Sequence, residues 1–140
     1  YSWGNIVASQ GSFVSTIVEK IQRGEVIPIT DERMSRFWLT IDQAADFMLS
    51  TYVVAARNRA MIPPVKGATV LRVVESIARV LGMGYSATEV GLRGVEKLYE
   101  VLESTHERCL RSDTCEQYTD AELDAMLGPL VLGIAKKGAA

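Results

Sequence analysis

The sequence predicts a mixed α/β fold: a small αβ subdomain in which short strands alternate with three or four helices. Three observations support this prediction. Apolar residues recur at helical spacing in several segments, and short apolar runs bounded by glycine or proline separate those segments. The chain has 140 residues, of which 48% are hydrophobic, which suffices for one domain with its own core. No repeat or linker divides it, so we expect a single domain over residues 1–140.

The first helix is expected between two short strands. Residues 1–8 end in an apolar run, and another short strand is expected at 25–30. Ser12 is a good N-cap for the helix between them, and Gly24 is expected to end it. The apolar residues that recur at helical spacing are Phe13, Val14, Ile17, Val18 and Ile21.

The second helix is expected to follow a charged turn at 31–33 and an extended segment at 35–41. Asp42 is the expected N-cap. The helix should end near the cations of 57–59, which favour the negative end of the helix dipole. Its broad apolar face comprises Ala44, Ala45, Phe47, Met48, Thr51, Tyr52 and Ala55.

The second half of the chain is expected to contain two long helices. The first should run from an N-cap at Thr69 to Gly82, and the last from a capping box at Thr119 to Gly128-Pro129. The remaining expected segments are a strand at 60–62, a strand at 85–92, a short helix at 96–102, an irregular segment at 106–118 and a frayed tail at 136–140.

The composition excludes several classes of protein. With 15 basic and 17 acidic residues, the chain has no basic excess for non-specific binding of nucleic acid. No apolar run is long enough to span a membrane, and no signal peptide is visible in residues 1–12, so we expect a cytoplasmic protein. The chain does not begin with Met, and we expect that it was processed or begins inside something longer. Cys109 and Cys115 are expected to be reduced, although a disulfide across this short loop is the alternative.

Common catalytic and cofactor motifs are absent from the sequence. It contains no G-x-G-x-x-G, no P-loop, no H-E-x-x-H and no G-x-S-x-G. The glycines of Gly82-Met83-Gly84 are expected at the end of a helix, where the dipole disfavours an anion. His106 is interpreted as a solvated histidine, and Asp42 and Asp46 as one solvated helix face. We therefore predict no catalytic residue and no metal ligand.

Two arginines and one glutamate lie near the ends of predicted strands. Arg36 precedes an aromatic strand, Arg93 follows an apolar one, and Glu96 comes three residues later. A guanidinium can donate two parallel hydrogen bonds to a phosphate, and a carboxylate suits a ribose diol. From spacing alone, these residues could equally be ordinary surface ion pairs.

Three segments resemble one enzyme family. Residues 3–12 (W-G-N-I-V-A-S-Q-G-S) are similar to the R-Y-G-N-V-x-G-S-R-G-S segment of bacterial UDP-N-acetylglucosamine 4,6-dehydratases, which are extended short-chain dehydrogenases. Residues 29–44 resemble their I-T-D-x-x-M-T-R-F-x-x-T-x-x-x-A. Residues 91–100 (G-L-R-G-V-E-K-L-Y-E) resemble their G-x-R-P-G-E-K-L-H/Y-E. The resemblance covers residues 1 to about 104 and leaves 105–140 as a divergent tail region.

The resemblance implies a substrate-binding role for residues in all three segments. Asn5 is expected to contact the diphosphate region of a UDP-sugar, Arg36 and Arg93 to clamp the diphosphate, and Glu96 to hold the uridine ribose. The strand at 26–30 would border the uracil.

The chain also departs from the family pattern. Ser2 and Gln10 stand where the family has arginines, and Gly94-Val95 stands where it has Pro-Gly. The whole enzyme, by resemblance, oxidises the sugar at C4 with NAD(P), eliminates water across C5 and C6 and returns the hydride. This chain contains neither the cofactor glycines nor a Tyr-x-x-x-Lys, so we expect it to bind no cofactor and to be inactive alone.

Two functions from different classes follow. The first is the UDP-sugar-binding, C-terminal-type part of a sugar-nucleotide dehydratase or epimerase of polysaccharide biosynthesis, with weak binding and no nucleic-acid or membrane partner. The second is a relic protein that binds no nucleotide sugar and forms a homo-oligomer. In that case self-association would cover an apolar face that comprises Ile6, Phe13, Phe37, Trp38 and Phe47.

Overall fold

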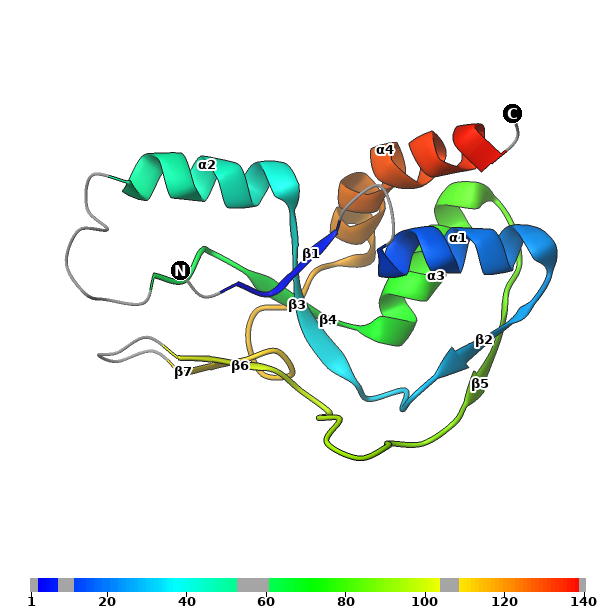
Figure 1. Ribbon diagram of the computed structural model, residues 1–140, viewed down its shortest axis with the longest axis horizontal. Coiled ribbons are helices and arrows are strands. Elements are labelled where there is room, and N and C mark those ends of the chain that lie inside the picture. Colours follow the sequence, from blue (N-terminus) through cyan, green and yellow to red (C-terminus); the bar gives the residue numbers. More distant parts are fainter. Residues whose placement is uncertain (1–2, 8–11, 53–60, 104–108, 139–140) are drawn as a thin grey trace.

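A computed structural model describes residues 3–7, 12–52, 61–103 and 109–138. Within these ranges four helices alternate with seven short strands (Figure 1), which confirms the predicted mixed α/β class. The elements are β1 (Asn5–Val7), α1 (Phe13–Arg23), β2 (Val26–Ile29), β3 (Ser35–Thr40), α2 (Ile41–Thr51), β4 (Lys66–Thr69), α3 (Val70–Leu81), β5 (Ser86–Glu89), β6 (Val101–Glu103), β7 (Cys109–Arg111) and α4 (Asp120–Gly138).

The strands of the described residues form three small sheets. The central one has the order β1-β3-β4, with β1 parallel and β4 antiparallel to β3. Strand β2 pairs with β5 in parallel, and β6 forms an antiparallel pair with β7. Strand β3 therefore joins the beginning of the chain to its middle.

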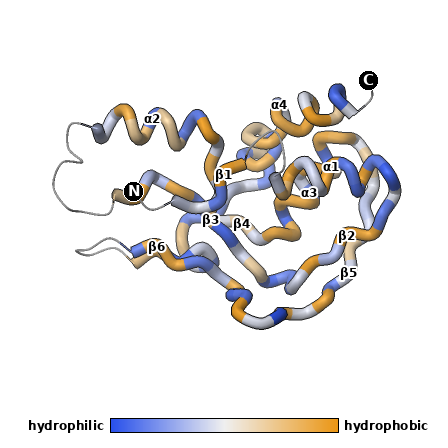
Figure 2. The backbone as a smooth tube through the Cα atoms, in the orientation of Figure 1, coloured by the Kyte–Doolittle hydropathy of each residue, from blue (hydrophilic) through white to orange (hydrophobic). Residues whose placement is uncertain are grey.

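The core lies where α1, α3 and α4 pack together, and Figure 1 shows α2 apart from these three helices. Figure 2 shows hydrophobic residues along all four helices. In α2, however, only Ala44 is buried. The fully buried side chains of the other three helices include Val14, Val18, Val73, Val74, Ile77, Leu123, Leu127 and Val131.

The predicted ends of α1 and α3 are confirmed. The Ser12 hydroxyl accepts a hydrogen bond from the backbone N–H of Ser15, and the Thr69 hydroxyl accepts one from that of Arg72. Gly24 and Gly82 end these helices in the left-handed region, with φ of 67° and 64°. Such φ values are typical of a glycine after the last helical residue.

The predicted cap of α2 is wrong. The N-cap is Thr40 rather than Asp42, and it forms a reciprocal capping box with Gln43. Asp42 lies in the first turn instead, where its negative charge still favours the helix dipole. The expected end of this helix, at 57–59, lies outside the described residues.

One predicted strand, one predicted helix and one segment predicted to be irregular are wrong. Met61 and Ile62 are not in a strand, and the strand before α3 is β4. The helix expected at 96–102 is a loop followed by β6, and the segment expected to be irregular contains β7. These residues are held by long-range contacts, such as the hydrogen bond from the Ser35 N–H to the Leu98 carbonyl (2.8 Å). Strand β5 is confirmed but shorter than the predicted 85–92.

The last helix continues past its predicted end. Pro129 lies inside α4, which extends to Gly138, so residues 136–138 are helical rather than a frayed tail. Leu123, Leu127 and Val131 recur every four residues and are fully buried. Continuing the helix keeps Val131 in the core, which offsets the backbone hydrogen bond that proline cannot donate.

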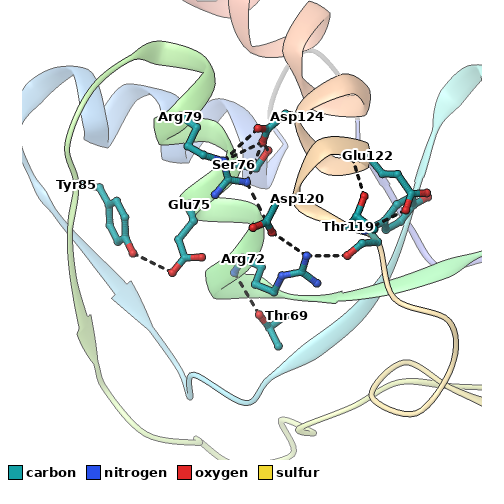
Figure 3. A network of polar contacts seen from close by, with 11 residues as sticks. Thr69, Arg72, Glu75, Ser76, Arg79, Tyr85, Thr119, Asp120, Glu122 and Asp124 are labelled. Atoms are coloured by element: carbon teal, nitrogen blue, oxygen red, sulfur yellow. Dashed lines mark hydrogen bonds and ion pairs between the residues drawn. The ribbon is translucent and has the colours of Figure 1, made fainter.

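Charged residues join α3 to α4 along one side of the core (Figure 3). Arg72 donates to the Tyr118 carbonyl (2.6 Å) and to Asp120 (2.9 Å). Arg79 pairs with Asp124 (2.9 Å), which also accepts from the Ser76 hydroxyl (2.6 Å). The Arg79 guanidinium lowers the pKa of Asp124. This network holds the two helices in register.

In the described ranges, no helix is both long enough and apolar enough to cross a membrane.

Candidate functional site

Two of the predicted site residues, Asn5 and Arg36, lie beside each other on strands β1 and β3. Both contact Glu100, which comes from the loop before β6. The Asn5 Nδ2 donates to both Glu100 carboxylate oxygens, each at 3.1 Å. The Arg36 Nε lies 3.6 Å from Glu100 Oε1. The structure therefore brings the first and second motifs together around the last residue of the third.

The parallel pairing of β1 with β3 explains this convergence. Asn5 pairs with Trp38 in the register, so its side chain also reaches the Phe37 carbonyl, to which Nδ2 donates at 3.3 Å. The Phe37 N–H in turn donates to Glu100 Oε2 at 3.2 Å. The loop is thus fixed to the edge of β3 by both backbone and side-chain groups.

A buried serine lies behind this cluster. Ser112 follows β7 and is fully buried, and its hydroxyl accepts a hydrogen bond from the Glu100 N–H at 2.9 Å. The same hydroxyl donates to the Ser35 carbonyl at 3.0 Å and lies 2.8 Å from the Ser35 hydroxyl. The segment that follows the three motifs therefore contributes a residue next to the candidate site.

The other two predicted site residues, Arg93 and Glu96, lie in an exposed loop. The Arg93 N–H donates to the Glu96 carboxylate at 3.4 Å, and the Glu96 N–H donates to the Arg93 carbonyl at 3.2 Å. In the described part of the chain, neither side chain forms a hydrogen bond or ion pair with Asn5 or Arg36. The structure thus yields two pairs of predicted site residues rather than one group of four.

The backbone of this loop explains one departure from the family motif. Gly94 has a φ of 57°, and Gly91 a φ of 82°. The family has proline at the position of Gly94, and the proline ring fixes φ near about −65°. The loop that carries Arg93 therefore has a conformation here that the family sequence could not adopt.

The strand expected to border a uracil is β2. Ile27 and Ile29 point into the core, whereas Val26 and Pro28 are exposed. Only this outer side of the strand could meet a ligand.

Sequence reasoning missed Glu100 and Ser112 as members of the cluster. Glu100 is the last residue of the third motif, and this position is the feature of the sequence that could have identified it. Ser112 lies in the segment expected to be irregular, and no local pattern distinguishes it from the serines of ordinary loops.

An open depression lies elsewhere, at the C-terminal end of α3. Its lining includes Glu75, Arg79 and Tyr85, together with Gly82-Met83-Gly84. Arg79 is already paired with Asp124, and the Tyr85 hydroxyl donates to Glu75 at 3.2 Å. Burial, together with Glu75, raises the pKa of Tyr85, so the phenol keeps its proton at neutral pH. The depression does not suit an anionic ligand, because the carbonyl end of α3 and the Glu75 carboxylate both repel negative charge.

In the described ranges, His, Cys, Asp and Glu form no group of three or more that could coordinate an ion. Cys109 and Cys115 are free thiols.

Comparisons with known proteins agree with the motifs. Residues 2–122 match the model of a family described as "Polysaccharide biosynthesis protein". A "UDP-N-acetylglucosamine 4,6-dehydratase (inverting)" of Campylobacter jejuni (strain 81-176) is 32% identical over 104 residues, which is 74% of this chain and 30% of the relative. A "UDP-glucose 4-epimerase" of Rickettsia conorii is 24% identical over 116 residues, which is 83% of this chain and 34% of the relative. The chain spans about a third of the length of these relatives.

A solved structure shows the same fold. The "X-ray structure of Pen from Bacillus thuringiensis" superposes with a TM-score of 0.74 over 93% of this chain and 49% of that chain, at 22% identity. The resemblance stated from the three motifs is thereby confirmed, both for the sequence family and for the fold.

Proposed function

Because this chain belongs to the polysaccharide biosynthesis protein family, we propose that it supplies the UDP-sugar-binding surface of a sugar-nucleotide 4,6-dehydratase or epimerase. The observation that carries the proposal is the convergence of Asn5, on β1, and Arg36, on the neighbouring strand β3, at the Glu100 carboxylate. A guanidinium held on a rigid strand beside a carboxylate that Asn5 anchors suits the oxygens of a diphosphate.

The described residues do not fit a nicotinamide cofactor. A dinucleotide pyrophosphate is normally held at a helix N-terminus by a glycine-rich turn. The Gly-x-Gly of this chain instead follows the C-terminus of α3, and Glu75 lies beside it. We therefore propose that this chain binds the nucleotide sugar without NAD(P) and performs no redox step by itself.

Titration calorimetry of the 140-residue chain with UDP and with UDP-N-acetylglucosamine tests the proposal. We expect weak binding that weakens further as salt rises, because exposed charges are screened. Arg36→Ala and Arg93→Ala should each cost on the order of 1–3 kcal/mol of binding free energy. Glu96→Gln should cost less, because an amide can still accept a hydrogen bond from ribose.

The matched control is Arg23→Ala, which removes an arginine paired with Glu19 on the surface of α1. This variant should bind UDP as the wild type does. Equal affinity of the wild type and Arg36→Ala for UDP would contradict the proposal and would make Arg36 a structural ion-pair residue.

The second candidate function is a self-associating protein that binds no nucleotide sugar. Its predicted apolar face is partly wrong, because Phe37 and Trp38 are buried in the core of this chain. A different surface favours self-association: four large side chains around α2 are between 46% and 78% exposed, namely Ile41, Met48, Leu49 and Tyr52.

A further inference from the structure

The guanidinium of Arg36 is held by two groups. Its Nη1 donates to the Ser35 carbonyl at 2.7 Å, and its Nε faces Glu100 at 3.6 Å. Within the described residues, no hydrogen bond to Nη2 accompanies these contacts. The side chain is 19% exposed. The Nε and Nη1 of the guanidinium are therefore directed at protein groups, and Nη2 is the nitrogen that the described residues leave for a ligand.

Both holding groups depend on the same hydroxyl. Ser112 Oγ donates to the Ser35 carbonyl, which is the acceptor of Arg36 Nη1. It also accepts from the Glu100 N–H, which fixes the backbone that carries the carboxylate. The Ser35 hydroxyl can donate to the remaining lone pair of Ser112 Oγ. The buried serine thus fixes both partners of the guanidinium.

The Glu100 carboxylate is more than a counter-charge. It accepts hydrogen bonds from Asn5 Nδ2 and from the Phe37 N–H in addition to the ion pair with Arg36. A carboxylate held by an amide and a backbone N–H has little freedom to rotate. It therefore fixes the direction in which the guanidinium can point.

We propose that Glu100 and Ser112 are positioning residues that hold Arg36 so that its Nη2 meets the diphosphate of a nucleotide sugar. This inference rests on the proposed function. It assigns a role in ligand recognition to the last residue of the third motif and to a serine that follows β7.

One substitution at Glu100 can distinguish a positioning role from a simple charge effect, because the two roles predict opposite changes in UDP affinity. A carboxylate that merely lies near the ligand repels a diphosphate, so its neutralisation would tighten binding. A carboxylate that positions Arg36 has the opposite effect, because its loss lets the guanidinium leave the binding geometry. Glu100→Gln therefore distinguishes the two roles, while it retains an oxygen that can accept from Asn5 or Phe37.

The experiment titrates UDP into four forms of the 140-residue chain: wild type, Glu100→Gln, Arg36→Ala and the double variant. We expect Glu100→Gln to weaken UDP binding about 5- to 10-fold. In the Arg36→Ala background it should have no further weakening effect, because the residue it positions is gone. Glu19→Gln is the matched control, since it neutralises a carboxylate paired with Arg23 on α1, and it should leave UDP binding unchanged.

A second measurement follows the arginine directly. In ¹⁵N-labelled protein, the Arg36 Nε–H resonance is identified by its loss in Arg36→Ala. We expect Glu100→Gln and Ser112→Ala to shift this resonance, and Glu19→Gln to leave it in place. If Ser112→Ala fails to fold, Glu100→Gln alone decides the outcome.

The results separate two failures. If the wild type does not bind UDP, the proposed function is wrong and the positioning role falls with it. If the wild type binds and Arg36→Ala weakens binding, but Glu100→Gln leaves it unchanged or tightens it, the proposed function stands and the positioning role is wrong. An unshifted Nε–H resonance in folded Glu100→Gln also overturns the positioning role.

Discussion

Gly67 in β4 lies where two segments of backbone meet closely. A Cβ built at this position would collide with the Ser112 carbonyl and would lie 2.8 Å from the Gln117 side-chain nitrogen. Gly67 also donates to the Glu116 carbonyl and accepts from the Tyr118 N–H, both at 2.9 Å. The absence of a side chain is what lets the segment before α4 lie against β4.

We expect Gly67→Ala to lower the free energy of unfolding by about 1–3 kcal/mol, because the Ser112 carbonyl belongs to the backbone and cannot move away cheaply. Chemical denaturation monitored by circular dichroism measures this. Gly133→Ala is the matched control, since a Cβ at this position of α4 meets nothing within 4 Å. It should leave stability unchanged or raise it, because alanine is a better helix former. A Gly67→Ala protein as stable as the wild type would show that β4 can move away from Ser112.

Individual residues show how far sequence reasoning reaches into the site. Asn5 and Arg36 were predicted from motifs, and the structure places them together, but the common partner Glu100 lies 95 positions from Asn5. No local pattern encodes a contact over such a separation. Their role in ligand binding stays a prediction until UDP binding is measured.

At the scale of elements, a single lysine connects β4 to α4. Lys66 Nζ pairs with Glu122 at 2.6 Å and with Glu116 at 3.1 Å. Glu122 also accepts from the Thr119 N–H, which completes the capping box of α4. The Lys66 ammonium and these Thr119 hydrogen bonds lower the pKa of Glu122 from 4.5 to about 2.

This shift predicts a pH dependence of stability. A carboxyl whose pKa is lowered on folding stabilises the fold above its ordinary pKa of 4.5, and that contribution is lost as the pH falls towards about 2. We expect the free energy of unfolding of the wild type to fall between about pH 4.5 and pH 2. Glu122→Gln should be less stable at pH 7, and its stability should fall less steeply over this range.

Asp31, whose pKa is lowered to about 2 by the hydrogen bond from the Arg33 side chain, contributes in the same pH range and is unchanged in the variant. Urea denaturation at a series of pH values measures both effects. Glu116→Gln is the control, because this exposed partner of Lys66 caps no helix. Parallel curves for the wild type and Glu122→Gln would show that the pair with Lys66 is not maintained in solution.

Elements with local signals were predicted, and elements fixed by long-range contacts were not. Helices α1 and α3 carry an N-cap hydroxyl, a periodic apolar face and a final glycine, all within their own residues. Strand β4 reads Lys-Gly-Ala-Thr and has no apolar alternation, so its pairing with β3 determines its conformation. The segment at 96–102 contains good helix formers, but its bonds to β3 and β7 override that propensity.

At the scale of the whole molecule, α2 carries a large part of the exposed apolar surface. Leu49 and Tyr52 are 76% and 78% exposed, whereas Ala44 is the buried residue of the helix. Apolar groups that project from a helix in this way are usually covered in solution. A homo-oligomer that covers this surface remains a prediction.

We expect the chain to self-associate through α2, with a mass that increases with concentration in light scattering. Leu49→Glu should shift the population towards monomer, because it places a charge in the contact. Leu132→Glu on α4 is the control, as this leucine is also exposed, at 50%, but lies on another helix. A monomer mass for the wild type at every concentration would argue against this interface.

The position of α4 in the core has a consequence for the order of events during synthesis. Its leucines pack against α1 and α3, so α1 lacks part of its packing until α4, which comes much later in the sequence, has been made. At about 5–20 residues per second, the ribosome needs several seconds to proceed from α1 to α4. Until then, the apolar faces of α1 and α3 lack their cover. A nascent chain that stalls before residue 123 should therefore present these faces to chaperones and proteases, and stable folding should begin only after α4 has left the ribosome.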